Sequence, residues 1–245
     1  MINRKMILRV MGSLLLIETA MLMLCAGISL LYQEDDLASF LLTAAITTII
    51  GSLLYLYGRK ADKELSRKDG YIIVTFSWII VSAFGMLPYY LSNYIPDITN
   101  AFFESISGFT STGSSILDNI EEFPHGLLFW RSLTQWIGGL GIVFFTIAVL
   151  PFFGVTGVQL FAAEATGLSH DKVHPRIGVT AKWIWLIYIG LTLVESILLR
   201  FGGMSFFDSI CHSLATTSTG GFSTKQSSIA FYKSRYIEYV VTLFM

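Results

Sequence analysis

Two short stretches of the chain combine hydroxyl side chains with glycine in a way suited to binding a cation. The first reads Thr-Ser-Thr-Gly-Ser at 110–114, and the second reads Thr-Thr-Ser-Thr-Gly-Gly at 216–221. Backbone carbonyls aimed at one axis can replace the hydration shell of a potassium ion, and glycine adopts the backbone angles that this requires. We therefore predict a potassium-binding filter formed by Thr110, Ser111, Thr112, Gly113, Thr217, Ser218, Thr219 and Gly220, with the ion at Thr112, Gly113, Thr219 and Gly220.

Each stretch follows a short apolar run, at 101–109 and 206–215, which is too short to cross a bilayer. Such a run followed by a turn predicts a re-entrant segment that enters the membrane and returns to the same side. Irregular backbone at membrane depth is tolerated where protein or a water-filled path satisfies its polar groups. A single copy would favour a glycine-capped helix end in an outer loop, whereas two copies favour the filter.

The rest of the chain has the composition of a membrane protein. Hydrophobic residues make up 53% and charged residues 13%, whereas a soluble domain carries about 25% charged residues. The net charge of −1 gives no indication of a nucleic-acid partner. Runs near the 20 residues needed to cross the hydrocarbon core occur at 6–31, 37–58, 71–94, 127–153 and 181–201, and another begins near 236. We therefore expect an all-α integral membrane protein.

The basic residues alternate between the links that join these spans. They cluster before the first span, at 59–68 and at 172–182, while the link at 33–36 contains acids and no base. The positive-inside rule places the N-terminus and the links 59–70 and 154–181 in the cytoplasm, and both glycine turns outside. Lys225, Lys233 and Arg235 are exceptions to this charge pattern.

The order of spans and turns predicts two repeats after a separate N-terminal part. Residues 1–60 form a two-helix extension, 61–153 a first membrane–pore–membrane repeat, and 154–245 a second repeat. About ten residues are available for the last span, which is too few to cross a membrane. We therefore expect an N-terminal fragment that carries two of four units of a pseudo-fourfold pore.

Two charged residues beside the first turn are candidates for supporting it. Glu104 lies in the first re-entrant run, and Arg131 lies at the outer start of the following span. Charges within membrane segments are costly and commonly functional. We expect Glu104 to brace the filter from behind together with Arg131, with direct ion contact by Glu104 as the alternative.

A glycine-rich segment and a histidine pair have structural interpretations. The segment Trp-Ile-Gly-Gly-Leu-Gly at 136–141 puts small residues where a neighbouring helix can approach, and it lacks the preceding strand of a nucleotide-binding turn. His170 and His174 are spaced for metal binding on a helix, but Pro175 follows at once. We interpret the first as packing and the second as part of an ordinary link.

Several of these segments together resemble the Trk/Ktr/HKT family of potassium-uptake proteins. The matching residues are Phe-Glu-Ser-Ile-Ser-Gly-Phe-Thr-Ser-Thr-Gly at 103–113, the segment 129–142, Glu164 with 175–177, and the segment 210–224. The two additional N-terminal helices favour the TrkH/TrkG branch. The first turn reads Thr-Ser-Thr-Gly-Ser where a common family form is Thr-Thr-Thr-Gly-Ala, which keeps the glycine and the hydroxyls.

The resemblance implies potassium uptake across a bacterial inner membrane by a multi-pass chain with a cytoplasmic N-terminus. It implies four repeats with one filter glycine each, of which Gly113 and Gly220 are two. It also implies a homodimer gated by a cytosolic TrkA-type nucleotide-binding ring, so the nucleotide belongs to the partner and this chain carries no cofactor.

Three other functions are alternatives to potassium uptake through a filter. A sodium-dependent Ktr-type potassium transporter and a non-conducting regulatory subunit of the membrane both stay open. An intramembrane enzyme is disfavoured, because Glu18 and Glu195 lie on separate spans and no HExxH or similar sequence occurs. We expect no enzymatic activity.

Overall fold

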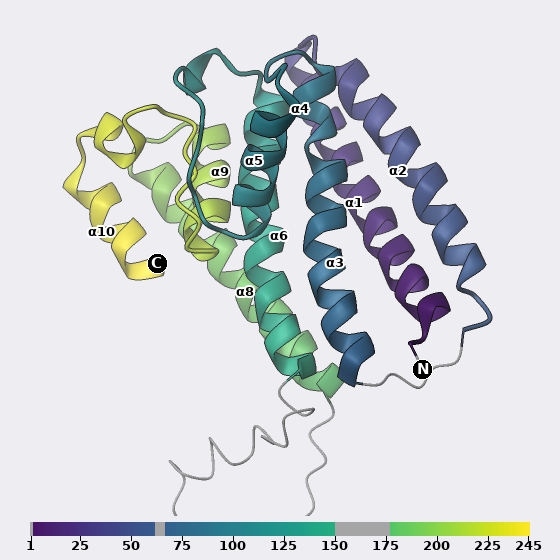
Figure 1. The fold of residues 1–245 in the computed structure, drawn as a ribbon. Helices are drawn as coiled ribbons and strands as arrows, with labels where there is room; N and C mark the ends of the chain where they lie inside the picture. The colour runs from purple at the N-terminus through teal and green to yellow at the C-terminus, as the bar shows by residue number, and fades with distance from the viewer. Residues whose placement is uncertain (1, 62–66, 150–176) are drawn as a thin grey trace, which may run out of the picture.

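The structure is a computed structural model that describes residues 2–61, 67–149 and 177–245. These residues form helices and turns without a strand, as the sequence predicts (Figure 1). The α-helices are α1 (Arg4–Tyr32), α2 (Leu37–Tyr57), α3 (Arg67–Gly85), α4 (Leu87–Leu91), α5 (Ile98–Phe109), α6 (His125–Val149), α8 (Ile177–Phe201), α9 (Phe206–Thr217) and α10 (Arg235–Phe244). Two short 3-10 helices, η1 (Ile120–Glu122) and η3 (Ser228–Tyr232), complete the set.

Within the described residues, four helical segments are long and apolar enough to cross a membrane: Arg4–Tyr32, Leu37–Tyr57, Lys68–Leu91 and Lys182–Phe201. They agree with the predicted spans to within a few residues. The predicted span 71–94 is interrupted, because α3 ends at Gly85 and α4 begins at Leu87. Pro88 lies in the first turn of α4, where a residue without an N–H is tolerated. Within a single helix that continued from α3 into α4, the same proline would remove an internal hydrogen bond and disrupt the helix. The predicted span 127–153 extends beyond the described residues.

The N-terminal extension is a hairpin of α1 and α2 that packs on the rest of the chain (Figure 1). The two helices approach closely, since a Cβ atom at Gly12 would lie 2.6 Å from the carbonyl oxygen of Gly51. At the turn between them, Glu34 Oε1 lies 2.7 Å from His125 Nδ1 at the start of α6. Phe40 of α2 belongs to one buried cluster with Trp130 of α6. The extension thus shares a core with the first predicted repeat.

The short helices α5 and α9 are the two predicted re-entrant helices. Each has 12 residues and an N-cap side chain, Asp97 accepting from the Asn100 N–H and Ser205 from the Asp208 N–H. Figure 1 shows both descending from the same end of the molecule, after which the chain turns at mid-height and returns. This agrees with the predicted path of the backbone.

The predicted end of the second re-entrant run was wrong by two residues. Residues 216 and 217 were placed in the turn, but α9 continues through Thr217. The Thr217 hydroxyl donates to the Ser213 carbonyl, 2.7 Å away and one helical turn earlier. A threonine can form this bond inside a helix. The presence of a hydroxyl residue at 217 therefore did not indicate that the helix had ended.

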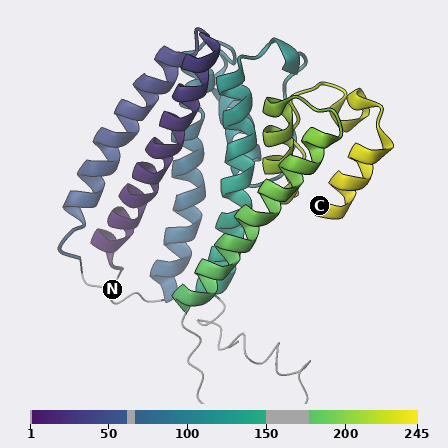
Figure 2. The ribbon, with the colours of Figure 1, turned by 180° about the vertical axis from the view of Figure 1, so that it is seen from behind.

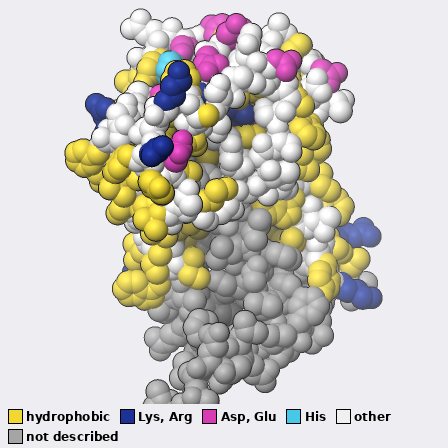
Figure 3. Space-filling model, turned by 90° about the vertical axis from the view of Figure 1, so that its left-hand side faces the viewer, with side chains coloured by type: hydrophobic (Ala, Val, Ile, Leu, Met, Phe, Trp, Pro, Cys, Tyr) yellow, Lys and Arg dark blue, Asp and Glu magenta, His cyan; other side chains and the backbone are white. Residues whose placement is uncertain are grey.

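The remaining views show how the second predicted repeat and the charges are arranged. In Figure 2, α8 crosses α6 obliquely, and the two helices are in contact. Figure 3 shows acidic side chains gathered at the end where α5 and α9 begin, above a surface rich in hydrophobic side chains. Residues 154–176 of the predicted link 154–181, which include Glu164, His170, Lys172, His174 and Arg176, lie outside the described residues, and α8 begins at Ile177 within the rest of this link.

Candidate ion-binding site

The first glycine turn is a Schellman motif at the C-terminus of α5. The N–H of Thr112 donates to the Ser107 carbonyl at 3.0 Å, and the N–H of Ser111 donates to the Gly108 carbonyl at 2.9 Å. Ser111 has a φ of 52° and Gly113 a φ of 75°. The motif ends the helix through a left-handed residue, and the second positive φ then redirects the chain at Gly113. The positive φ angles at Ser111 and Gly113 thus change the direction of the peptide groups that follow α5.

The second turn, at the end of α9, repeats these bonds. The N–H of Gly220 donates to the Ala215 carbonyl at 2.8 Å, and the N–H of Thr219 donates to the Thr216 carbonyl at 2.7 Å. Thr219 has a φ of 52°, and Gly221 has a φ of 86°. Thr219 is therefore the counterpart of Ser111, and Gly221 that of Gly113.

The hydrogen bonds align the two turns one residue away from the alignment that the sequence suggests. The sequence paired Gly220 with Gly113 because each follows a threonine in the order Ser-Thr-Gly. By hydrogen bonding, Gly220 occupies the position of Thr112 instead. Sequence reasoning omitted Gly221 from the site, although the second glycine of the pair was the available signal.

The two turns lie against one another, and Gln135 of α6 lies beside both. A Cβ atom at Gly113 would lie 2.0 Å from the carbonyl oxygen of Gly220, and one at Gly220 would lie 2.3 Å from the Gln135 side chain. Gln135 Oε1 accepts from the Phe222 N–H at 3.0 Å, and its backbone carbonyl accepts from the Ser111 hydroxyl at 3.2 Å. Gln135 is fully buried, so it connects the two turns inside the protein. The sequence analysis did not identify it.

Replacing Gln135 with leucine is expected to destabilise the protein and, because Gln135 contacts both turns of the predicted filter, to weaken the predicted discrimination between potassium and sodium. The buried N–H of Phe222 would lose its acceptor, which costs about 1–3 kcal/mol. The matched control is Gln226→Leu, which removes the acceptor of another backbone N–H, that of Ile120, from an exposed side chain. Thermal unfolding and the ratio of rubidium to sodium flux measure both effects. Equal results for the two variants would contradict this role.

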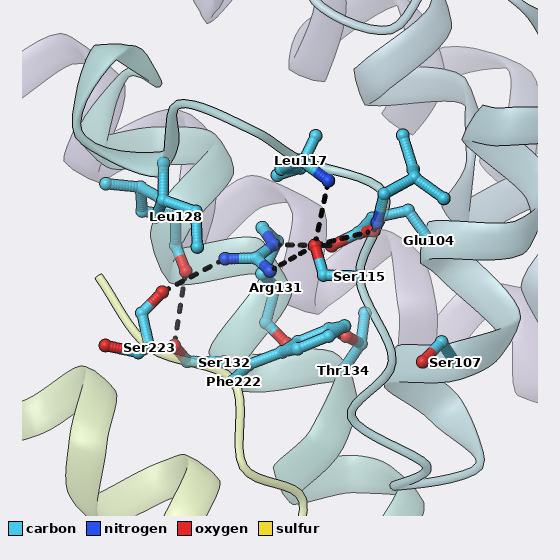
Figure 4. Close-up of polar contacts among 12 residues, drawn as sticks. Glu104, Ser107, Ser115, Leu117, Leu128, Arg131, Ser132, Thr134, Phe222 and Ser223 are labelled. Atoms are coloured by element: carbon cyan, nitrogen blue, oxygen red, sulfur yellow. Dashed lines mark hydrogen bonds and ion pairs between the residues drawn. The ribbon is translucent and has the colours of Figure 1, made fainter. Parts of the chain in front are cut away.

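Behind the turns, Glu104 of α5 and Arg131 of α6 form a buried ion pair (Figure 4). Arg131 Nε donates to Glu104 Oε1 at 2.8 Å, and the two side chains are 1% and 0% exposed. Glu104 also accepts from the Ser115 hydroxyl at 3.0 Å and from the Ile116 N–H at 3.2 Å. The predicted pair is therefore formed, and it holds the segment that returns from the first turn.

Arg131 also reaches the segment that follows the second turn (Figure 4). Its Nη1 donates to the Ser223 carbonyl at 3.1 Å, and its guanidinium carbon lies 4.2 Å from the centroid of the Phe222 ring. One buried cation thus connects the return segments of both turns.

His212 is the counterpart of Glu104 in the second repeat, since each lies seven residues after its N-cap, Asp97 or Ser205. His212 Nε2 lies 3.4 Å from the Ser223 hydroxyl, as Glu104 bonds Ser115. His212 is buried and lies within hydrogen-bonding distance of this hydroxyl. The two turns are therefore supported at the same position by different side chains.

The glycines of the 136–141 segment allow α6 to pack against the ends of both short helices. A Cβ atom at Gly138 would lie 2.0 Å from the carbonyl oxygen of Phe109, the last residue of α5. One at Gly139 would lie 2.9 Å from the Cβ of Ser218, which caps α9. The prediction that this segment serves packing is confirmed.

The remaining predicted site residues differ in where their side chains lie. The hydroxyls of Thr110 and Thr112 are 2.7 Å apart, and the Ser218 hydroxyl donates back to the Leu214 carbonyl at 3.0 Å. Thr217 Oγ1, whose proton goes to the Ser213 carbonyl, also lies 3.2 Å from Glu195 Oε2 of α8. Its hydroxyl thus lies between its own helix and α8.

The sequence matches the family described as "TrkH: Cation transport protein" over residues 37–245. It is 39% identical over 242 residues to the Trk system potassium uptake protein TrkH of Escherichia coli K12, covering 98% of this chain and 50% of that protein. TrkG of the same organism is 34% identical over 219 residues, which cover 89% of this chain and 45% of TrkG. The chain thus spans about half the length of the curated relatives it matches.

A solved structure agrees with the fold. The crystal structure of the potassium transporter TrkH from Vibrio parahaemolyticus superposes with a TM-score of 0.84 at 32% identity, covering 98% of this chain and 48% of that one. The apolar helices and these similarities make the protein a multi-pass membrane protein. On this evidence the chain belongs to the TrkH cation transport family, in the TrkH/TrkG branch of the Trk proteins.

Proposed function

We propose that this chain contributes two of the four segments of a potassium-selective filter in a membrane protein that takes up potassium. The observation that carries the proposal is the duplicated turn. Two re-entrant helices end in the same pair of hydrogen bonds, followed by a glycine with positive φ, and the turns touch one another. The names of the relatives, which are potassium uptake proteins, support the same function.

The backbone carbonyls of the turns would supply the ligands. Thr112, Gly113, Thr219 and Gly220 are the predicted contacts, and Gly221 joins them as the counterpart of Gly113. The C-termini of α5 and α9, where the turns begin, carry partial negative charge that favours a cation. The Glu104–Arg131 pair would hold both turns at the required spacing without presenting a net charge to the ion.

The proposal includes the arrangement that the family resemblance implies. Two further repeats would complete a pseudo-fourfold ring, and two such chains would form a homodimer in the bacterial inner membrane, with the N-terminus in the cytoplasm. A cytosolic TrkA-type ring would gate the pore through its bound nucleotide. Arg4, Lys5 and Arg9 in the first turns of α1 lie at the end of the molecule opposite to the starts of α5 and α9, which is consistent with this orientation (Figure 1).

The decisive test is rubidium uptake into liposomes that contain the complete protein. We expect uptake in the absence of sodium, and inhibition by excess external potassium. Uptake that requires sodium would favour the Ktr-type alternative. Absence of uptake, both alone and with the TrkA-type partner, would contradict the proposal and favour a regulatory subunit.

A further inference from the structure

A lateral crevice between the predicted spans lies outside the candidate filter. It has a volume of about 380 Å³ and lies between α1, α3, α6 and the end of α5. Ligand sites in proteins commonly have volumes of roughly 300–1,000 Å³. Val10, Leu14, Ile17 and Glu18 of α1 line it. At 1.5 Å per residue, these residues extend over about 12 Å of the helix axis. The crevice is therefore large enough for a compact organic molecule.

The lining is apolar except for two side chains, Ser77 and Glu18. The Ser77 hydroxyl is already bonded, since it donates to the Ile73 carbonyl at 2.6 Å. Glu18 is only 4% exposed, and neither of its carboxyl oxygens has a hydrogen-bond partner among the described residues. Leaving a buried polar group unpaired is costly, and an ionisable residue within a membrane is a functional candidate by default. Glu18 thus lines the crevice with an unused polar group, but both carboxyl oxygens are buried, so a ligand would reach them through rotation of this side chain.

We infer that this crevice binds a compact hydrophobic amine, with Glu18 as its hydrogen-bonding and charge partner. A neutral amine can reach the crevice through the lipid without carrying charge into the membrane. Transfer of the proton from the Glu18 carboxyl to the amine nitrogen then leaves an ammonium–carboxylate pair with no net charge. A primary ammonium has three N–H donors, which can satisfy both carboxyl oxygens, whereas an alcohol has one.

The position of the crevice relates it to the candidate filter. Phe109 and Ile137 also line it, and Phe109 is the last residue of α5, directly before the first turn. A bound amine would therefore contact the helix that carries this turn. Neither of the measurements below depends on ion flux, so their outcome is separate from that of the proposed function.

Chemical capture tests the inference on the complete protein in lipid nanodiscs. The Glu18 carboxyl O–H adds across a C=N bond of dicyclohexylcarbodiimide to form an O-acylisourea. Without amine, the acyl group migrates to nitrogen and gives a stable N-acylurea. A primary amine beside Glu18 attacks the acyl carbon instead, forms an amide and releases dicyclohexylurea. Peptide mass spectrometry distinguishes the two adducts.

With 1-adamantylamine as the probe, we expect the Glu18 adduct to change from N-acylurea to amide, whereas 1-adamantanol leaves the N-acylurea unchanged. Glu195 is the matched control, because it is a buried acid in another span whose Oε1 also has no hydrogen-bond partner among the described residues, but which does not line the crevice. We expect no adduct there. Absence of an adduct at Glu18, equal modification of Glu195, or an N-acylurea that the amine does not change would each overturn the inference.

A second measurement avoids covalent chemistry. Trp78 lines the crevice, so amine binding should change its fluorescence, and Trp78→Phe identifies that signal. The substitution Glu18→Gln keeps the size of the side chain and should weaken binding roughly tenfold or more. Thermal unfolding confirms that this variant is folded. Unchanged affinity in a folded Glu18→Gln variant would overturn the role of Glu18.

Discussion

Replacing Arg131 with methionine in the complete protein is expected to abolish rubidium flux and to destabilise the fold by about 3–5 kcal/mol. The substitution leaves the carboxylate of Glu104 buried without a cation, since this side chain is 0% exposed in the pair. It also removes the bond to the Ser223 carbonyl and the contact with the Phe222 ring. Both return segments would lose their common support. Rubidium flux and thermal unfolding measure the two effects.

The double variant Glu104→Gln with Arg131→Met separates the lost charge from the lost connection between the turns. It contains no unpaired buried charge, and a glutamine at 104 can still accept from Ser115 and Ile116. We expect much of the stability to return, while flux stays impaired because the Ser223 carbonyl remains without its donor. A double variant as unstable as Arg131→Met, or a single variant with normal flux, would contradict the proposed role of the ion pair.

The substitution Gly113→Ala is expected to reduce rubidium flux by roughly tenfold or more, because two costs combine at this residue. A φ of 75° is in the left-handed region, where a side chain costs about 1–2 kcal/mol. The added methyl group would also lie 2.0 Å from the Gly220 carbonyl oxygen. The two turns must therefore separate, which would displace the proposed ligands. Flux in liposomes and the rubidium-to-sodium ratio check this result.

Two further glycine substitutions separate backbone strain from position in the filter. Gly203→Ala is the matched control outside the turns, and Gly221→Ala tests the second turn. Gly203 has a φ of 100°, and a Cβ atom there meets no described atom within 4 Å. Gly203→Ala should therefore introduce backbone strain alone, and its rubidium flux should stay close to that of the unsubstituted protein. Gly221 has the same open surroundings and a φ of 86°, but lies in the second turn, so its substitution should alter selectivity. If Gly113→Ala behaves like Gly203→Ala, the first turn is not part of the filter.

Features that depend on residues close together in the chain could be predicted before the fold was known. Apolar runs long enough to cross the membrane predicted α1, α2 and α8 to within a few residues, because length and hydrophobicity suffice for such helices. Short amphipathic runs before glycine turns predicted α5 and α9. The acid and base of the Glu104–Arg131 pair were recognised because a charge within a membrane segment requires a partner.

Only the tertiary structure decided the features that depend on residues far apart in the chain. The pairing of Gly113 with Gly221 follows from hydrogen bonds within each turn, which the repeated Ser-Thr-Gly order concealed. The role of Gln135 depends on contacts with both turns, and that of Arg131 on the Ser223 carbonyl, 92 positions away. The unpaired carboxyl of Glu18 is evident only once α1, α3 and α6 enclose it. Packing of the helices brings these groups together. The order of residue types along the chain does not indicate which distant residues will be in contact.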